Sequence, residues 1–413
     1  MPRLHPFRAL RYRESLSSLS DLLAPPYDVI SPEQAQLLRD RHPANAVRLV
    51  LPEGDPPERY EAAARVLSEW IEAGILERDR RPGVTVYRQT FEDRSGTLTR
   101  HALFAALEVS PFGAGNVLPH ERTHSGPKRD RLALTLATRT QLSPVFLSSR
   151  DRDGALYGRL LEVAAGEPEF DARTADGVLH AIWKVADPET CSGLCAAAGS
   201  GPLLIADGHH RYETALEVRR LLGDDHPEAG KVLACVVSGS DPGLKIQPTH
   251  RTLLAAPPGR PGAAWADLLR EVFRLERLEG GDPADLAEEA QEGRSPVLVT
   301  GAGAWRLRPT TGAARARGLD EADLSIASVV LDRLVVEGIL GVDADAAAHD
   351  GWLAYFRDPA AAIAAAGNRG AAFLLPAVSQ DDVWKVTGLG RRLPPKSTYY
   401  EPKIPSGLLF RPL

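Results

Sequence analysis

Residues Pro202–Leu216, PLLIADGHHRYETAL, contain the change of pattern that decides how this part of the chain folds. The apolar run Leu203–Ala206 predicts a short buried strand, and the pair Asp207 and Gly208 is a turn signal. From Tyr212 onward, apolar residues recur at the spacing of a helix. The sequence therefore predicts a strand, a glycine turn and a helix start in immediate succession.

Three side chains that can carry positive charge follow this turn, namely His209, His210 and Arg211. A helix N-terminus presents backbone N–H groups and the positive end of the helix dipole, and arginine can grip a phosphate with two hydrogen bonds. Asp207 could bind Mg²⁺ or accept a hydroxyl proton. The pattern predicts an anion site, with phosphate as the expected anion. The alternative is an Asp207 helix cap with histidines on the surface.

A second polar segment, residues 120–131, combines an acid, hydroxyl groups, a glycine and several cations. Phosphoryl transfer uses these groups to hold phosphates and to activate a nucleophile. Gly126 and Lys128 lack the spacing of a Walker loop. A solvated charged loop is the alternative interpretation. The candidate site residues in this segment are Glu121, Thr123, His124, Ser125, Lys128 and Arg131, with Glu121 and Asp207 as candidate metal ligands.

Two later segments add further cations. Pro248–Arg251 repeats the His-Arg pair, and Leu393–Gly407 is an irregular tail rich in proline, lysine and tyrosine. Lysines from such a tail could close over a polyanionic ligand, whereas a turn boundary and a docked surface segment are the alternatives. The candidate phosphate-binding or nucleotide-binding residues here are His250, Arg251, Lys396, Ser397 and Lys403, which join Gly208 in the first segment.

Length and charge limit the class of protein. The chain has 413 residues and a net charge of −6, with 43% hydrophobic and 25% charged residues. This balance is typical of a soluble globular protein of two or three domains. The negative charge argues against nucleic-acid and membrane partners. No signal peptide and no membrane-spanning run is recognisable, so we expect a cytoplasmic protein with reduced cysteines, and an oligomer remains open.

Strand and helix patterns alternate irregularly, which predicts an α+β fold of mixed sheets with helices. Ala46–Leu51 is predicted as a strand, and Ile246–Leu253 as a polar loop. The Pro- and Gly-rich stretch Ala255–Gly262 is the expected linker. We therefore expect an N-terminal α+β domain over residues 1–254 with the phosphate-binding motif. A second α+β domain over residues 263–413 would end in the returning lysine-rich tail.

Six motifs in order make the chain resemble the DUF1015 family, a bacterial and archaeal family of cytoplasmic proteins. They are APPYDVI (24–30), ERTHSGPKRDR (121–131), SPVF (143–146), ADGHHRYETA (206–215), PTHR (248–251) and PPKSTYYEPKIPSGL (394–408). Genes of this family tend to lie beside genes of the phosphorylated serine pathway. The resemblance therefore implies serine or phosphoserine as a ligand, by association.

Within that resemblance, the Asp-Gly-His-His-Arg motif is similar to the phosphate-binding turn of ParB/sulfiredoxin-like proteins. These include free-serine kinases, nucleotide-hydrolysing DNA partition proteins and sulfiredoxins. The resemblance implies a ParB/sulfiredoxin-like core in which Asp207, Gly208, His209, His210 and Arg211 bind nucleotide phosphates. Sulfiredoxin chemistry needs a neighbouring cysteine, and the sequence has none near Asp207.

These observations predict a phosphoryl-transfer enzyme acting on a small hydroxyl metabolite. Free serine is the expected substrate, as a kinase or, in the reverse direction, as a phosphoserine phosphatase. Mg²⁺ and ATP or ADP are the implied cofactor and co-substrate. A nucleotide-binding regulatory module of the ParB-like type and a non-catalytic partner of serine-biosynthesis enzymes are the alternatives.

Overall fold

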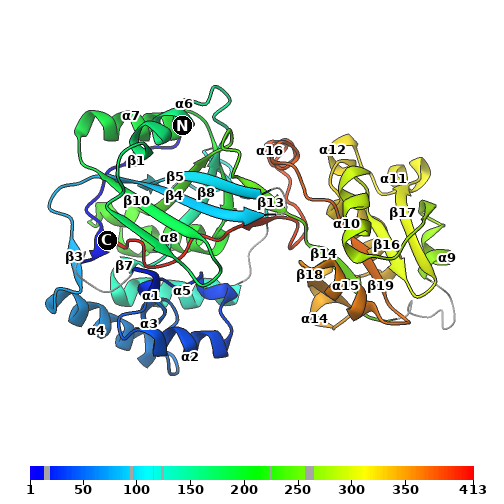
Figure 1. Cartoon of the computed structure of the whole chain (residues 1–413), viewed down its shortest axis with the longest axis horizontal. Coiled ribbons are helices and arrows are strands. Elements are labelled where there is room, and N and C mark those ends of the chain that lie inside the picture. Colours follow the sequence, from blue (N-terminus) through cyan, green and yellow to red (C-terminus); the bar gives the residue numbers. More distant parts are fainter. Residues whose placement is uncertain (14–18, 94–95, 115, 122–124, 224, 256–264) are drawn as a thin grey trace. The chain divides into compact units, whose positions relative to one another are not determined.

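The computed structural model describes residues 1–413 except 14–18, 94–95, 115, 122–124, 224 and 256–264. The chain forms two compact units (Figure 1). Unit 1 comprises residues 1–119, 123–245 and 402–413, and unit 2 comprises residues 120–122 and 246–401. This boundary lies before the expected linker, most of which is outside the described residues. The end of the expected C-terminal domain belongs to unit 1.

Unit 1 is built on a mixed nine-stranded sheet (Figure 1). Strand β12 lies parallel to β8 on one side and antiparallel to β5 on the other, so the sheet is not doubly wound. In spatial order the strands are β6 (Val117–Leu118), β11 (Leu203–Asp207), β8 (Val145–Ser149), β12 (Lys231–Ser238), β5 (Gly96–Glu108), β4 (Val84–Asp93), β10 (Leu179–Val185) and β9 (Phe170–Arg173), with β1 (Leu4–His5) beside β5.

Three helices pack on one face of this sheet and form its main core with alternating strand residues. The core contains Leu156 of the first helix, Leu194 of the second and Tyr212 of the third. The helices are α6 (Ala155–Ala164), α7 (Pro188–Ala198) and α8 (His209–Leu222). Because side chains alternate along a strand, the polar pair Gln89 and Arg100 projects from the opposite face.

A helical layer forms a second core in unit 1, together with Phe410, which lies three residues before the end of the sequence. It contains α1 (Leu19–Leu22), α2 (Pro32–Arg41), α3 (Val47–Val50), α4 (Glu58–Glu72) and α5 (Ser125–Thr138), the strands β2 (Leu10–Tyr12) and β3 (Leu76–Arg78), and the 3₁₀ turn η1 (Tyr27–Val29). Helix α5 also packs against α8 and so connects this layer with the main sheet.

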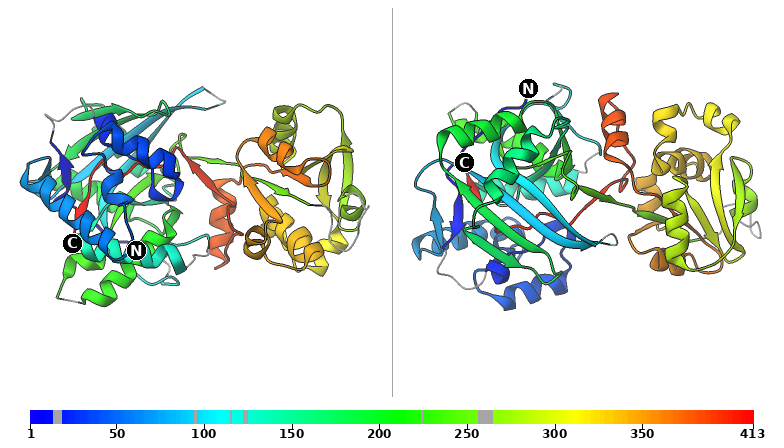
Figure 2. Two further views of the ribbon diagram at one scale, coloured as in Figure 1. Left: turned by 90° about the horizontal axis from the view of Figure 1, so that it is seen from below. Right: turned by 45° about the horizontal axis from the view of Figure 1, so that its top comes forward.

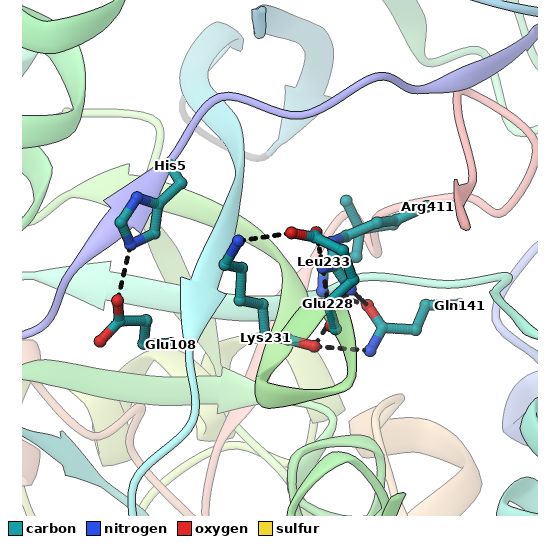
Figure 3. Close-up of polar contacts among 7 residues, drawn as sticks. All are labelled: His5, Glu108, Gln141, Glu228, Lys231, Leu233 and Arg411. Atoms are coloured by element: carbon teal, nitrogen blue, oxygen red, sulfur yellow. Dashed lines mark hydrogen bonds and ion pairs between the residues drawn. The ribbon is translucent and has the colours of Figure 1, made fainter. Parts of the chain in front are cut away.

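The end of the chain lies within unit 1 (Figure 2). One buried arginine, Arg411, anchors it there (Figure 3). Arg411 donates to the side chain of Gln141 at 3.2 Å and to the backbone carbonyl of Lys231 at 3.1 Å. It also pairs with Glu228 Oε2 at 2.6 Å. Strand β21 (Arg411–Pro412) pairs with β7 (Thr140–Gln141), and the short turn η2 spans Pro227–Gly230. The residues before Arg411 are therefore held in unit 1.

Unit 2 has a six-stranded sheet that contributes to a separate hydrophobic core. In spatial order the strands are β15 (Phe273–Leu278), β17 (Gly303–Pro309), β16 (Val297–Thr300), β19 (Ala371–Leu374), β14 (His250–Leu253) and β18 (Leu353–Phe356), with β13 (Lys245–Gln247) and β20 (Tyr399–Glu401) paired separately. The helices are α9 (Trp265–Leu269), α10 (Pro283–Glu292), α11 (Thr311–Ala316), α12 (Glu321–Leu324), α13 (Ala327–Leu331), the π-helix η3 (Asp332–Leu340), α14 (Ala344–His349), α15 (Pro359–Ala366) and α16 (Gln380–Gly388).

The α+β class is confirmed, and two local predictions are wrong. Ala46–Leu51 contains helix α3 and no strand, because the Asn45 side chain accepts a hydrogen bond from the Val47 backbone and starts the turn. Ile246–Leu253 is not a polar loop, because its end is the buried strand β14 between β18 and β19. None of the described helices combines the length and apolar character needed to span a bilayer.

Candidate functional site

The predicted strand, glycine turn and helix are confirmed around Asp207. Strand β11 ends at Asp207, Gly208 adopts a left-handed conformation with φ of +92°, and α8 begins at His209. The register of β11 against β8 shifts between Ile205 and Asp207. The helix begins three residues before the expected Tyr212, so both histidines and Arg211 lie in its first turn.

Asp207 is the centre of two ion pairs in unit 1. Its Oδ2 accepts a hydrogen bond from Arg211 Nη2 at 2.5 Å, and its Oδ1 accepts one from Lys403 Nζ at 2.9 Å. The side chains of Asp207, Arg211 and Lys403 are 20%, 9% and 16% exposed. Two cations and one carboxylate leave one surplus positive charge at this corner, which we call the Asp207 corner.

These cations control the ionisation of the carboxyl group. Burial by itself raises the pKa of Asp207, but the charges of Lys403 and Arg211 outweigh burial and hold the pKa well below its usual range. Asp207 is therefore ionised at every physiological pH. A carboxylate of such low basicity is a poor proton acceptor, so its role is to position the two cations.

Both the left-handed backbone and the lack of room for a side chain favour glycine at position 208. A Cβ atom there would lie 2.8 Å from Arg211 Nε and 2.9 Å from Cζ, because the guanidinium folds back over the turn. Arg211 is fixed in this position by Asp207 and by the Pro144 carbonyl oxygen, to which Nη1 donates. The positive φ adds strain for any residue with a side chain.

Lys403 comes from the end of the chain, and the polar face of the sheet holds it. Arg100 is fully buried and donates to Gln89 and to the Pro402 carbonyl, while Gln89 Nε2 donates to the Lys403 carbonyl at 3.0 Å. The Arg100 guanidinium lies 5.0 Å from the ring centroid of Phe146. A buried arginine thus fixes the backbone that delivers the lysine to Asp207.

Other motif segments are tied to the same tail. Ser406 Oγ and Ser143 Oγ lie 2.6 Å apart, and the backbones of Ser406 and Ala24 exchange two hydrogen bonds of 2.8 and 3.1 Å. Segments that are remote in sequence therefore meet in unit 1 beside the Asp207 corner.

A small cavity of about 40 Å³ lies beside Arg211 and is also lined by Tyr27, Arg131 and Thr214. The Arg131 guanidinium lies 4.0 Å from the Tyr27 ring centroid, and its Nη1 donates to the Val50 carbonyl at 2.7 Å. Thr214 Oγ1 is buried without a hydrogen-bond partner among the described residues. The cavity is large enough for ordered water.

The remaining candidates of residues 120–131 are distributed differently. Lys128 on α5 pairs with Glu213 on α8 at 2.6 Å, which connects the two helices. Ser125 begins α5, and Thr123 and His124 lie outside the described residues. Glu121 belongs to unit 2.

The other candidates of unit 2 form a separate cluster. Arg251 is fully buried and donates to the backbone carbonyls of Ser328 at 3.2 Å and Pro395 at 3.0 Å. Ser397 Oγ accepts from Ser328 Oγ at 2.9 Å. His250 Nδ1 accepts the backbone N–H of Leu375 at 3.1 Å. Lys396 is exposed and has a φ of +55°.

Asp207 does not fit a role as a magnesium ligand, because both of its oxygens already accept hydrogen bonds from cationic side chains. In the described part of the chain, no group of three or more His, Cys, Asp or Glu residues is arranged to hold a metal ion. The expected partner ligand Glu121 belongs to the other unit. We therefore derive no chemistry from a protein-bound metal.

Sequence reasoning missed the groups that support the corner. Arg100 and Gln89 lie in stretches that look like ordinary strands. The Pro144 acceptor is a backbone carbonyl, which the residue type does not indicate. A weak signal existed for Pro144, because it lies in the SPVF motif. Only pairing of β4 with β5 shows that Gln89 and Arg100 are neighbours.

Solved structures with similar folds give weak likenesses. A variant of a free serine kinase in complex with ADP has a TM-score of 0.35 and 13% identity over 69% of this chain and 84% of that chain. A conserved hypothetical protein from Pyrococcus furiosus has a TM-score of 0.33 and 14% identity, over 70% of this chain and 90% of that chain. C-terminally truncated SbnI from Staphylococcus aureus has a TM-score of 0.32 and 11% identity, over 72% of this chain and 78% of that chain.

Likenesses at these TM-scores carry no functional argument, and no curated protein matches the chain. The family model for a protein of unknown function, DUF1015, matches residues 4–330. This range includes the Asp207 motif and most of both units. The chain therefore belongs to the DUF1015 family.

Proposed function

We propose that this protein transfers a phosphoryl group between a nucleotide and the hydroxyl group of a small metabolite. The observation that carries the proposal is the Asp207 corner, where Lys403 and Arg211 meet the N-terminus of α8 with one surplus positive charge. Helix N-termini with nearby cations bind phosphate groups. We propose ATP or ADP as the nucleotide.

The corner supports a mechanism based on positioning and charge. Lys403, Arg211 and the first turn of α8 would bind phosphate oxygens and stabilise the charge that develops during transfer. In the kinase direction, the metabolite's hydroxyl oxygen forms the new bond to phosphorus while the bond to the nucleotide's bridging oxygen breaks. We propose that His210, which is less buried than His209, accepts the hydroxyl proton.

Free serine is the proposed metabolite, and phosphoserine is the proposed substrate in the reverse direction. This proposal is supported by the resemblance of the Asp-Gly-His-His-Arg motif to free-serine kinases. Its five motif positions, Asp207 to Arg211, all lie at the end of β11 and in the first turn of α8. The structure contributes the charge of the site, and the resemblance contributes the substrate class.

A nucleotide-binding regulatory module is the second candidate. The ion pairs of Asp207 favour it, because Lys403 and Arg211 can bind an anion while the acid that they hold ionised is too weak a base to take a proton. A non-catalytic partner of serine-biosynthesis enzymes remains an expectation from the family resemblance alone.

The test measures phosphate exchange by the full chain. Purified protein is incubated with Mg²⁺ and with serine plus ATP or ADP, and separately with phosphoserine plus a nucleotide acceptor or water. We expect turnover with at least one pair. Nucleotide binding without turnover would replace the proposal with the regulatory module, and absence of both would overturn the Asp207 corner as a phosphate site.

Lys403→Met tests the corner directly, because it removes one cation and keeps the aliphatic stem. We expect a loss of turnover of about 100-fold or more, as for the removal of one charged group that stabilises a transition state. Lys184→Met is the matched control. Lys184 also pairs with a carboxylate of unit 1, Glu169, at 3.1 Å, but on β10 near the opposite edge of the sheet.

A further inference from the structure

Unit 2 contains a cleft of about 640 Å³ that is lined by the π-helix η3, the start of α14 and the segment Gly390–Pro395. Small-molecule sites in proteins have volumes of roughly 300–1,000 Å³. Every lining residue belongs to unit 2, so the cleft is independent of the Asp207 corner.

A buried carboxyl group, one oxygen of which has no hydrogen-bond partner among the described residues, forms part of the cleft wall. Asp332, the first residue of η3, is 8% exposed, and its Oδ1 has no hydrogen-bond partner among the described residues. Arg251 Nε and Tyr355 Oη are also buried without partners among those residues. Native proteins pair nearly all buried polar atoms, so such a group calls for an explanation, such as a missing ligand.

Charges of both signs surround Asp332. Burial has the largest effect and, together with the charges of Glu337 and Asp343, it outweighs those of Arg251 and Arg333 and raises the pKa of Asp332 to about 6. Asp332 is therefore an anion at neutral pH. A buried anion without a hydrogen-bonded cation is costly, and a ligand that brings a positive charge would offset this cost.

Arginines also line the cleft. Arg317, Arg333 and Arg392 are exposed, and Arg391 is half-buried and pairs with Asp320 at 2.6 Å and with Asp323 at 3.1 Å. Hydrogen bonds hold these side chains in place: Arg317 donates to the Gly338 carbonyl at 3.1 Å, and Arg333 to Glu337 at 2.9 Å. The lining of the cleft thus offers both the Asp332 carboxylate and several guanidinium groups to a ligand.

A metal ion does not fit this arrangement, because the described residues contain no group of three potential ligands around a common point. An ammonium group fits better, since it carries three donors and needs no fixed coordination geometry. A carboxylate on the same ligand would face the guanidinium groups of the lining, which match its shape.

We propose that this cleft binds a small zwitterion of the α-amino-acid type, with its ammonium group donating to Asp332 and its carboxylate facing the lining arginines. The site goes beyond the proposed phosphoryl transfer and does not depend on it. It would serve as a second ligand site in unit 2.

The experiment measures binding by titration calorimetry and by the shift in melting temperature of the full chain at pH 7.5. The probes are L-serine and a panel of the other proteinogenic amino acids, together with ethanolamine, which lacks the carboxylate, and glycolate, which lacks the ammonium group. We expect at least one amino acid to bind. Glycolate should not bind at this site, and ethanolamine should bind more weakly than serine.

Asp332→Asn should weaken binding of that amino acid by at least about 10-fold, the usual scale for losing a hydrogen bond to a charged group. Asp350→Asn, at an exposed position just after α14, is the matched control and should bind normally. The melting temperature of each free variant shows that it is folded.

Asp207→Asn separates the two sites. Binding that survives Asp207→Asn and is lost in Asp332→Asn supports the cleft. Binding that is lost only in Asp207→Asn belongs to the Asp207 corner and overturns this inference, as does the failure of every amino acid in the panel to bind.

Discussion

The chain contains two His-Arg pairs, and the structure uses them in opposite ways. His210 and Arg211 begin a helix, where Arg211 is hydrogen-bonded to the carboxylate of Asp207. His250 and Arg251 lie in the buried strand β14, where Arg251 donates to two backbone carbonyls. In the first case the acid has two cationic partners. In the second, Oδ1 of the nearby acid Asp332 has no hydrogen-bond partner among the described residues.

This difference shows that an identical dipeptide does not define a site. At the helix start, Asp207 and Lys403 stay 20% and 16% exposed, which allows the phosphate site that we propose there. In the strand, complete burial makes Arg251 a support for the fold, and the proposed ligand group is the nearby Asp332. Four substitutions would break or sharpen this comparison.

The largest effect is expected for Arg251→Ala. The variant leaves two buried carbonyls without their donor and a cavity in unit 2, so we expect a loss of about 3 kcal/mol in the free energy of unfolding of that unit. Arg211→Ala should cost less, because its site is partly exposed. Hydrogen exchange resolved by segment measures each unit separately. An equal loss in both variants would contradict the assigned roles.

Asp332→Asn should stabilise the protein by about 3 kcal/mol at pH 7.5, since a shift of one pKa unit corresponds to about 1.4 kcal/mol. The folded-state pKa of about 6 lies above the usual value. The native state therefore binds the extra proton, and stability falls as the pH rises from about 4 to 6. Urea unfolding of both proteins across this range should show the difference vanish near pH 4. A destabilised variant would show that Asp332 has a partner.

Asp207→Asn should destabilise the protein, in contrast to Asp332→Asn. We expect a smaller effect, a loss of about 1 kcal/mol in the free energy of unfolding at pH 7. The folded-state pKa of Asp207 is depressed by Lys403 and Arg211 despite burial. Its contribution is thus present above the unfolded pKa of about 4 and is lost as the pH falls below it. The same urea series tests this. A difference between the proteins that stays constant from pH 7 to pH 2 would refute the ion pairs as its source.

Gly208→Ala should change stability by a similar small amount, about 1 kcal/mol in total, from the left-handed backbone and from contact of the new Cβ with Arg211. Gly154→Ala is the matched control, because Gly154 also caps a helix with a positive φ but has no atoms within 4 Å of the added Cβ. We expect only Gly208→Ala to reduce phosphate exchange. Equal effects of the two substitutions on unfolding and on phosphate exchange would show that contact with Arg211 does not matter at Gly208.

Local patterns predicted the parts of the Asp207 corner that lie close together in sequence. The apolar run of β11, the glycine turn and the helical spacing of α8 act over a few residues, so their order was predictable. The same reasoning failed at Ala46–Leu51, where the side chain of Asn45 starts a helical turn. It also failed at β14, where the sequence is polar. The neighbouring strands β18 and β19 bury these residues, and no hydrophobic pattern in β14 itself indicates this.

The sequence by itself determined the class of the fold and the strand–turn–helix that carries Asp207 and Arg211, because hydrophobic periodicity and glycine conformation are local properties. Only the tertiary structure decided that Lys403 meets Asp207 across 196 residues and that Arg251 loses contact with water. The physical reason is that ion pairing and burial depend on which distant segments pack together. That packing sets the pKa of each acid and hence the chemistry open to it.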